Sequence, residues 1–305
     1  MNELTGTVDV RVGGRNQVRT NSILTFAKKA VVGWIAVLGL LAQSSRVEAD
    51  RDVLLTYLSA LGQEVASLIA VSPSKLQPFL PPGYAIIPAS ALGVGDLNQG
   101  IVGITVYRGI GALIDRIPSV ADSHVAIMVS IVVAEPAEAV GAGLSIPGAF
   151  HFYILAIYTN DPLYAAHLGE ADLPVELVRK ILYQRPMDDA TGVGDMSANI
   201  PSKGSPFMTV TSGFGYALAT GALNAVFWYN GHHGKMALHF AQPYRIGNAI
   251  SQIYTKPASP LEALLKDGGS GPCLSDPETG YSCVTAPALN LRYDQGSDGT
   301  LLLIE

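Results

Sequence analysis

The chain has 305 residues, of which 49% are hydrophobic and 14% are charged, with 32 glycines and a formal net charge of −6. This composition excludes a disordered chain, because it supplies enough apolar surface for a packed core. The negative net charge, without a lysine and arginine cluster in the body of the chain, excludes a basic nucleic-acid-binding protein. We therefore expect no nucleic-acid partner.

The first 49 residues have the pattern of a secretory signal peptide. Basic residues precede the apolar run 30–42, and Val47-Glu48-Ala49 resembles a small-x-small cleavage site. A membrane-spanning helix needs roughly 20 apolar residues, so the run is short for a permanent anchor. An uncleaved anchor or a buried helix is the alternative. We predict cleavage after Ala49, a secreted or periplasmic protein, and membrane contact only through this segment.

The remaining chain, 50–305, is expected to form one β-rich domain. Apolar residues at helical spacing over 52–66 predict a short helix that packs across a sheet. Later segments are rich in Val, Ile, Tyr and Phe and bounded by turn residues, which is typical of strands. We expect strands near 66–71, 84–91, 101–107, 124–134, 150–158, 207–214, 222–229, 235–241 and 250–254.

Two further helices are expected, at 173–183 and at 260–266, the first opened by Pro174. The segment 123–133 is nearly continuously apolar, as in a strand that is covered on both faces. The sequence therefore predicts a mainly β protein with a few helices (α+β). Its predominantly antiparallel sheet would be closed or partly closed around a cavity.

The two cysteines, Cys273 and Cys283, bracket a turn-rich stretch within the loose interval 267–295. A pair that close in a loop reaches disulfide distance easily, and a disulfide agrees with export. Two thiols at this spacing lack the C-x-x-C knuckle of a structural zinc site. We predict a disulfide that fastens a surface loop.

The stretch 66–84 contains an apolar run, a Ser-Pro turn and Leu80-Pro-Pro-Gly83. It resembles the strand, short helical turn and L-P-x-G motif of the acetoacetate decarboxylase-like superfamily, and 101–107 and 124–133 fall where that family has two core strands. The stretch 152–174 is similar to its next strand, Asp/Asn-rich turn, Gly-Arg-Glu and following Pro-Lys. The resemblance implies a sheet around a cavity and carbon–carbon lyase chemistry on a keto acid or a related small carbonyl or carboxylate compound.

The lysine pair that follows the proline in this family is missing here. Its members use a lysine amine to attack the substrate ketone, whereas Pro174 is followed by Val175 and Glu176. Glu170 keeps the place of the family's glutamate, and Lys180 is expected at the surface. The resemblance therefore implies an altered reaction, and the sequence leaves open whether the protein is an enzyme.

Four residues are the candidates for chemistry in such a cavity. His124 and His151 open expected core strands, and either of these or Glu170 would move a proton. Arg108 ends an apolar strand and would bind a substrate carboxylate through two hydrogen bonds. The alternative interpretations are structural histidines and a solvent-facing arginine.

Other site classes are not favoured. No phosphate-binding glycine loop or G-x-S-x-G motif is present, so neither a nucleotide cofactor nor a serine hydrolase is expected. His233 and His239 are separated by six residues, roughly 20 Å along a strand, which is too far to share one metal ion. We expect no cofactor and no metal.

The sequence thus predicts an exported acetoacetate decarboxylase-like enzyme that acts on a small carbonyl or carboxylate compound. The alternative is a non-catalytic exported carrier or sensor of small molecules on the same fold. A homo-oligomer is compatible with either prediction.

Overall fold

The computed structural model describes residues 52–119, 121, 124–184, 188, 191–200, 207–266, 268–269, 271–273, 280–294 and 296–304, with backbone alone over 207–222 and 271–272. The signal peptide expected over 1–49, with its apolar run 30–42 and its cleavage site after Ala49, lies outside the described residues. Within them, no helix has the length and apolarity needed to cross a membrane.

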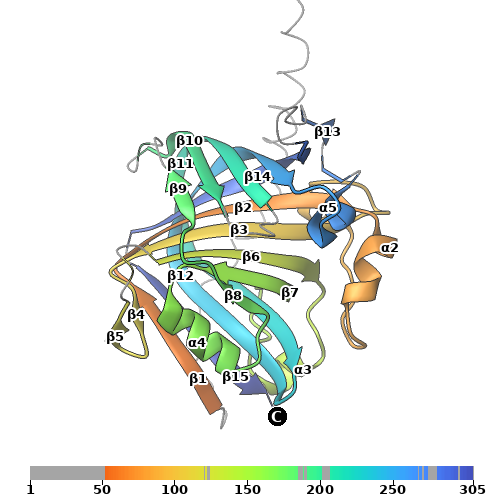
Figure 1. Ribbon diagram of the computed structural model, residues 1–305. Coiled ribbons are helices and arrows are strands. Elements are labelled where there is room, and N and C mark those ends of the chain that lie inside the picture. Colours follow the sequence, from red (N-terminus) through yellow and green to blue (C-terminus); the bar gives the residue numbers. More distant parts are fainter. Residues whose placement is uncertain are drawn as a thin grey trace, which may run out of the picture.

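Strands make up most of the described chain (Figure 1). The strands are β1 (Asp52–Ser59), β2 (Leu61–Val71), β3 (Gly100–Ile110), β4 (Leu113–Ile114), β5 (Ile117–Pro118), β6 (His124–Val133), β7 (Phe150–Thr159), β8 (Val175–Leu177), β9 (Leu182–Gln184), β10 (Val193–Asn199), β11 (Phe207–Gly231), β12 (Gly234–Thr255), β13 (Gly271–Pro272), β14 (Ser282–Tyr293) and β15 (Ser297–Ile304). The helices are α2 (Pro73–Leu76), α3 (Glu138–Gly141), α4 (Pro162–Glu170) and α5 (Pro260–Leu265), with short 3-10 turns η1 (Gln77–Phe79) and η2 (Ala89–Leu92).

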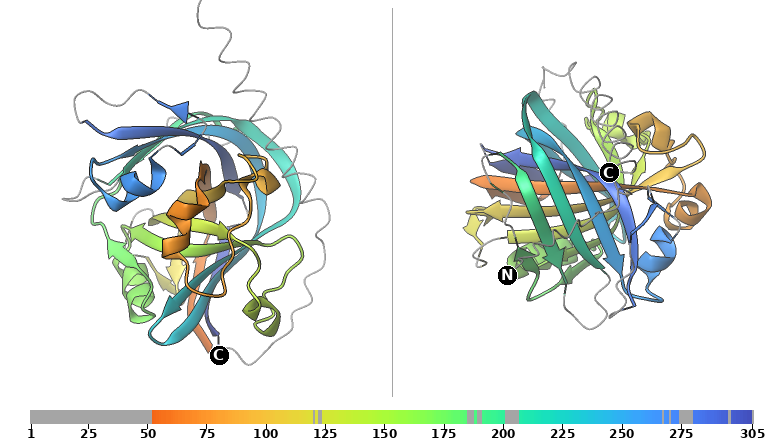
Figure 2. Two further views of the ribbon diagram at one scale, coloured as in Figure 1. Left: turned by 90° about the vertical axis from the view of Figure 1, so that its right-hand side faces the viewer. Right: turned by 90° about the horizontal axis from the view of Figure 1, so that it is seen from above.

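The long hairpin β11–β12 closes the sheet on itself. Near its turn, β11 pairs with β7 and β12 pairs with β15; toward its other end, β11 pairs with β10 and β12 pairs with β14. The remaining order runs β14-β2-β3-β6-β7, so the strands form a ring from β12 back to β11. Figure 1 shows β2, β3, β6 and β7 side by side, and Figure 2 (left) shows α2 and α5 in front of one end of the ring.

Strand β6 explains how the ring has two distinct faces. All ten of its residues are buried, as the apolar stretch 123–133 predicted. Alternate side chains point to opposite faces of a strand. Val125 and Ile127 therefore pack with Trp228 in one core cluster, whereas Ala126 and Met128 join another cluster on the opposite face. The prediction of a mainly β fold with a partly closed, largely antiparallel sheet is confirmed.

The helix expected at 52–66 is wrong, because this segment forms β1 and the start of β2. In β1 the inward residues Leu55, Tyr57 and Ser59 alternate with more exposed neighbours, a period of two. Apolar residues at 53, 54 and 58 fitted a helical face in the sequence but lie 55%, 37% and 41% exposed. Short apolar runs fit both periods, and pairing with β15 decides for strand.

Further along the chain, the helix expected at 173–183 is also wrong, since β8 and β9 lie there. The helix of this region is α4, which starts earlier at an Asp-Pro signal: Asp161 caps it, and Pro162 occupies its first turn. The strand expected at 84–91 is reduced to one bridge, between Ile86 and Val133, followed by η2.

The C-terminal third is more regular than expected. The strand pairs expected at 207–214 and 222–229, and at 235–241 and 250–254, each belong to one long strand with register shifts between the halves. The interval 267–295, expected as a loose loop, contains β14, which lies between β12 and β2. The strands expected near 66–71, 101–107, 124–134 and 150–158 and the helix α5 are confirmed.

Cys273 and Cys283 form the predicted disulfide, with their Cα atoms 5.4 Å apart. The bond joins the end of β13 to β14. It closes a loop with a sequence separation of 10.

Reduction, or the double substitution Cys273→Ser and Cys283→Ser, is expected to lower the free energy of unfolding by about 2 to 3 kcal/mol, because the open loop gains entropy in the unfolded chain. Urea unfolding with and without dithiothreitol measures this loss, and the double variant, as the control, should not respond to the reductant. An unchanged wild-type midpoint under reducing conditions would contradict the prediction.

Candidate functional site

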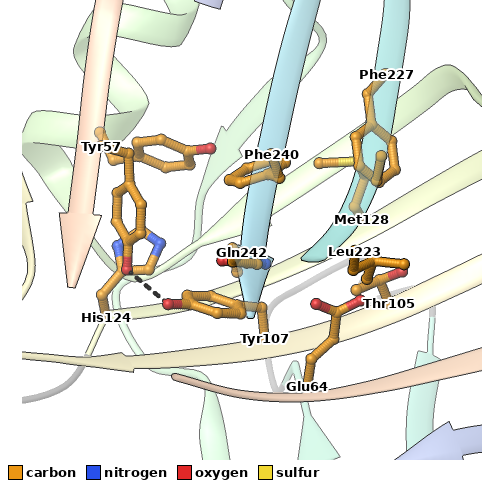
Figure 3. A pocket seen from close by; sticks show the side chains of 13 residues that line it. Tyr57, Glu64, Thr105, Tyr107, His124, Met128, Leu223, Phe227, Phe240 and Gln242 are labelled. Atoms are coloured by element: carbon orange, nitrogen blue, oxygen red, sulfur yellow. Dashed lines mark hydrogen bonds between the residues drawn. The ribbon is translucent and has the colours of Figure 1, made fainter. Parts of the chain in front are cut away.

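A cavity of about 50 Å³ lies between the inner face of β2, β3 and β6 and the hairpin β11–β12, with β1 and α4 at its side (Figure 3). A space of this size holds a few water molecules or one small organic molecule. Its aromatic lining residues are Tyr57, Tyr107, Tyr164, Phe227 and Phe240. Its polar lining residues are Glu64, Thr105, His124 and Gln242, and the remaining walls are aliphatic.

Glu64 is the carboxylic acid of the cavity. It lies on β2 directly opposite Tyr107 of β3, and its Oε2 accepts a hydrogen bond of 2.6 Å from the hydroxyl of Tyr293. Burial raises the pKa of Glu64 to about 7, an effect that the hydrogen bond from Tyr293 opposes only in part. The described lining contains no lysine or arginine. His124 is therefore the only basic residue of this lining that could compensate the negative charge of Glu64.

A hydrogen-bonded group of hydroxyls forms the floor beside Glu64. The Tyr57 hydroxyl donates to the Tyr107 Oη over 3.3 Å, and the Tyr107 hydroxyl also bonds to Ser59 Oγ, at 2.8 Å, and to Ser297 Oγ. Burial raises the pKa of both tyrosines. Their hydroxyls therefore remain protonated at neutral pH, and each has a single proton, which Tyr57 gives to Tyr107 in the protein without ligand.

Two glycines make room for these tyrosines. Gly62 of β2 and Gly109 of β3 face each other in the sheet. A Cβ atom at Gly109 would clash with the Tyr57 Oη, and one at Gly62 would come within 2.8 Å of the Tyr293 Cδ2. These tyrosines can approach the sheet so closely only because both positions lack a side chain.

His124 is oriented by a fully buried aspartate. Its Nδ1 lies 3.2 Å from Oδ2 of Asp161, which also accepts a hydrogen bond from Ser119 Oγ. The other oxygen, Oδ1, caps α4 through the backbone N–H groups of Leu163 and Tyr164. Burial raises the pKa of Asp161, but these hydrogen bonds outweigh it and bring the pKa to about 2. Because Nδ1 faces the carboxylate, Nε2 is the ring nitrogen left for a ligand.

Of the four candidates from the sequence, only His124 lines the cavity. Glu170 is exposed at the end of α4. Arg108 is adjacent in sequence to Tyr107 and therefore points to the opposite face of β3, where its guanidinium lies 5.4 Å from the ring centroid of Tyr183. The structure does not bring either residue to the cavity.

His151 also lies away from the cavity, on the face of β7 that packs against Trp228. Its Nδ1 accepts a hydrogen bond of 3.1 Å from Trp228 Nε1, and its Nε2 lies 3.7 Å from a carboxylate oxygen of Glu135. Burial lowers the pKa of His151, with Glu135 opposing the shift. These contacts fit the structural interpretation of this histidine.

The structure places no lysine amine where the acetoacetate decarboxylase-like resemblance would have one. Val175, at the position of the expected lysine, packs against the core cluster that contains Tyr57 and Tyr164. Glu176 and Lys180 are exposed, and none of the lysines that the structure describes is buried. The same described residues contain no group of three or more His, Cys, Asp or Glu side chains that could hold a metal ion.

The sequence analysis missed the carboxylic acid and the aspartate of this site. The helix predicted over 52–66 concealed Glu64. A strand assignment would have placed Glu64 on the face opposite to that of its buried neighbours Gln63 and Val65, because successive side chains of a strand point to opposite faces. Asp161 carried a signal of its own, since an Asp-Pro pair before an apolar stretch is typical of a helix start.

Comparisons with known proteins find similarity in fold alone. No protein-family model matches the sequence, and no curated protein matches it significantly. One similar solved structure is the enduracididine biosynthesis enzyme MppR, complexed with the condensation product of pyruvate and imidazole 4-carboxaldehyde, at 9% identity over 85% of this chain and 90% of that chain, with a TM-score of 0.46. A second is an acetoacetate decarboxylase-like enzyme from Sphingomonas wittichii RW1, at 11% identity over 86% of this chain and 97% of that chain, with a TM-score of 0.46. A third is acetoacetate decarboxylase from Legionella pneumophila subsp. pneumophila, at 9% identity over 87% of this chain and 94% of that chain, with a TM-score of 0.42. The chain is distantly similar to these structures, and the similarity says nothing about its reaction.

The raised pKa of Glu64 predicts a stability that depends on pH. The folded protein keeps the Glu64 proton up to about pH 7, whereas the unfolded chain releases it near 4.5. This contribution to stability is complete below pH 4.5, decreases between pH 4.5 and 7, and is fully lost above the folded pKa of about 7, a change of about 3 kcal/mol. Urea unfolding of the wild type and of Glu64→Gln from pH 4 to 8 measures it. As the pH rises over this range, the free energy of unfolding of the wild type should fall relative to that of Glu64→Gln. A difference in unfolding free energy that stays constant with pH would contradict the assignment.

Proposed function

We propose that the protein is an exported enzyme that binds a small, neutral carbonyl compound in this cavity and moves a proton at the carbon next to the carbonyl group. The observation that carries the proposal is the buried carboxyl group of Glu64, which faces an apolar cavity with a pKa of about 7. General bases work best when their pKa lies near the working pH, and enzymes raise carboxyl pKa values by burial for this purpose.

The charge of the cavity favours a neutral ligand over a keto acid. A carboxylate ligand would meet the carboxyl group of Glu64 without a lysine or an arginine in the described lining. Arg108, which was expected to bind such a carboxylate, points to the other face of β3. Within the range that the resemblance implied, an uncharged ketone or aldehyde therefore fits better than an anion.

Proton transfer would proceed between Glu64 and the ligand, while hydrogen-bond donors that line the same cavity stabilise the carbonyl oxygen (Figure 3). The Glu64 carboxylate removes a proton from the carbon next to the carbonyl group, and the electron pair moves to the carbonyl oxygen. The hydroxyl of Tyr107, or that of Tyr57 once it turns away from Tyr107, would donate a hydrogen bond to the resulting enolate. Glu64 then returns the proton to carbon, so that atoms and charge balance.

Export is the part of this proposal that rests on sequence. The basic segment and the apolar run 30–42 support a signal peptide, and the disulfide Cys273–Cys283 suits an oxidising compartment. The proposed location is secreted or periplasmic, and the signal is the only part of the chain proposed to contact a membrane.

Deuterium exchange tests the reaction without knowledge of the natural substrate. The wild type is incubated in D₂O with small neutral ketones and, separately, with keto acids, and loss of the α-proton signal is followed by NMR. We expect exchange that Glu64→Gln reduces by at least about 100-fold, since a general base contributes roughly 10² to 10⁴ in rate. Glu170→Gln is the matched control and should retain full exchange, because Glu170 is exposed and outside the cavity.

Three results would contradict this function. Equal exchange in the wild type and in Glu64→Gln would remove Glu64 from the reaction. A covalent adduct on a lysine after borohydride treatment with a keto acid would restore Schiff-base chemistry. Reversible binding of ketones without exchange would instead favour a carrier or sensor, the alternative supported by the absence of an amine nucleophile from the described lining.

A further inference from the structure

Gln242 presents an unsatisfied oxygen at the cavity wall. Its side chain lies on β12 among the lining residues (Figure 3), and the residue is only 3% exposed. The side-chain oxygen Oε1 is buried without a hydrogen-bond partner. An acceptor left unpaired in the interior is destabilising, and native proteins leave few of them. This oxygen is therefore a place where a ligand could supply the missing donor.

The network around Tyr293 decides which end of the Gln242 amide remains free. The Tyr293 hydroxyl gives its proton to Glu64 Oε2, so its oxygen can only accept further hydrogen bonds. The side chain of Gln242 hydrogen-bonds to this tyrosine. The amide must therefore turn its NH₂ group to Tyr293, which leaves Oε1 without a donor. Ionised Glu64 thus leaves the oxygen as the unpaired end of the Gln242 amide.

We infer that the ligand is an α-hydroxy carbonyl compound, whose hydroxyl group donates a hydrogen bond to Gln242 Oε1. The inference rests on the proposed function, because it assumes that the cavity binds a carbonyl compound beside Glu64. The terminal torsion of glutamine is soft, so a small rotation of the amide brings the buried oxygen to a donor in the cavity. Removal of the proton from the carbon that bears the hydroxyl gives an enediolate. Glu64 then returns the proton to the same carbon, or to the neighbouring carbon while the hydroxyl proton moves from one enediolate oxygen to the other.

A matched pair of ligands tests the inference directly. 3-Hydroxybutan-2-one and 3-methylbutan-2-one differ by a hydroxyl in place of a methyl group, with nearly the same shape. We expect the wild type to bind the hydroxyketone about tenfold more tightly in NMR titrations, because only the hydroxyl satisfies the Gln242 oxygen. Gln242→Met keeps the length of the side chain without its polar atoms, and we expect it to abolish or reverse this preference.

Gln252→Met is the matched control on the same strand. Gln252 accepts a hydrogen bond from the Tyr254 hydroxyl and does not line the cavity, so the tenfold preference should persist. If Gln242→Met does not fold, Tyr293→Phe replaces it: this variant frees the amide to turn and should reduce the preference severalfold. Equal binding of the two ligands by the wild type would overturn the inference, as would an unchanged preference in Gln242→Met or, in its place, Tyr293→Phe.

Failure of this inference and failure of the proposed function give different results. Equal affinities together with Glu64-dependent exchange would overturn the α-hydroxy ligand and leave proton transfer intact. A clear preference for the hydroxyketone without exchange would support the Gln242 contact and overturn the catalytic role of Glu64.

Discussion

The site depends on one electrostatic constraint: the carboxyl group of Glu64 is held in an apolar cavity without a basic partner in the described lining except His124. The cost of charging it there raises its pKa to about 7, so the group exchanges its proton near neutral pH. The hydrogen bond from Tyr293 lowers the energetic cost of the Glu64 charge in part. Tyr293 also hydrogen-bonds to Gln242, and so connects Glu64 to the β12 side of the cavity. A lysine in this cavity would neutralise the carboxylate and lower its pKa.

The architecture supplies the walls that this constraint requires. The hairpin β11–β12 pairs with strands at both ends of the curved sheet, so the cavity is enclosed by β2, β3 and β6 on one side and by the hairpin on the other. Alternation along each strand then separates two environments. Glu64 and Tyr107 face the cavity, whereas Arg108 and His151 point to the other face. Asp161 links the cavity to α4, because one carboxylate both caps the helix and orients His124.

The sequence predicted the fold class well and the site only in part. Long apolar segments such as 123–133 predicted strands because their burial is independent of register. The disulfide and the absence of the lysine pair could likewise be read from local residues, Cys273 and Cys283 in one case and Val175 in the other. The candidates Arg108 and Glu170 do not line the cavity, because the direction of a side chain depends on strand register and on the start of a helix, which only tertiary pairing settles.

Glu64 could not be found for a related reason. In 52–66 the apolar positions fit both a helix and a pair of strands, and the choice between them decides whether Glu64 faces solvent or the interior. The pairing partners that settle it, β15 and β14, lie more than 200 residues further along the chain. Gln242 is similar: its unpaired oxygen exists only because Tyr293, on another strand, gives its proton to Glu64.

The most direct test of this account is a titration of the Glu64 carboxyl group by ¹³C NMR on protein labelled at the glutamate side-chain carboxyl carbon, with Glu64→Gln used to assign the signal. The account predicts a pKa of about 7 for this group in the protein without ligand. A pKa near the ordinary glutamate value of 4.5 would show that its charge is compensated or solvated, and would contradict the central claim.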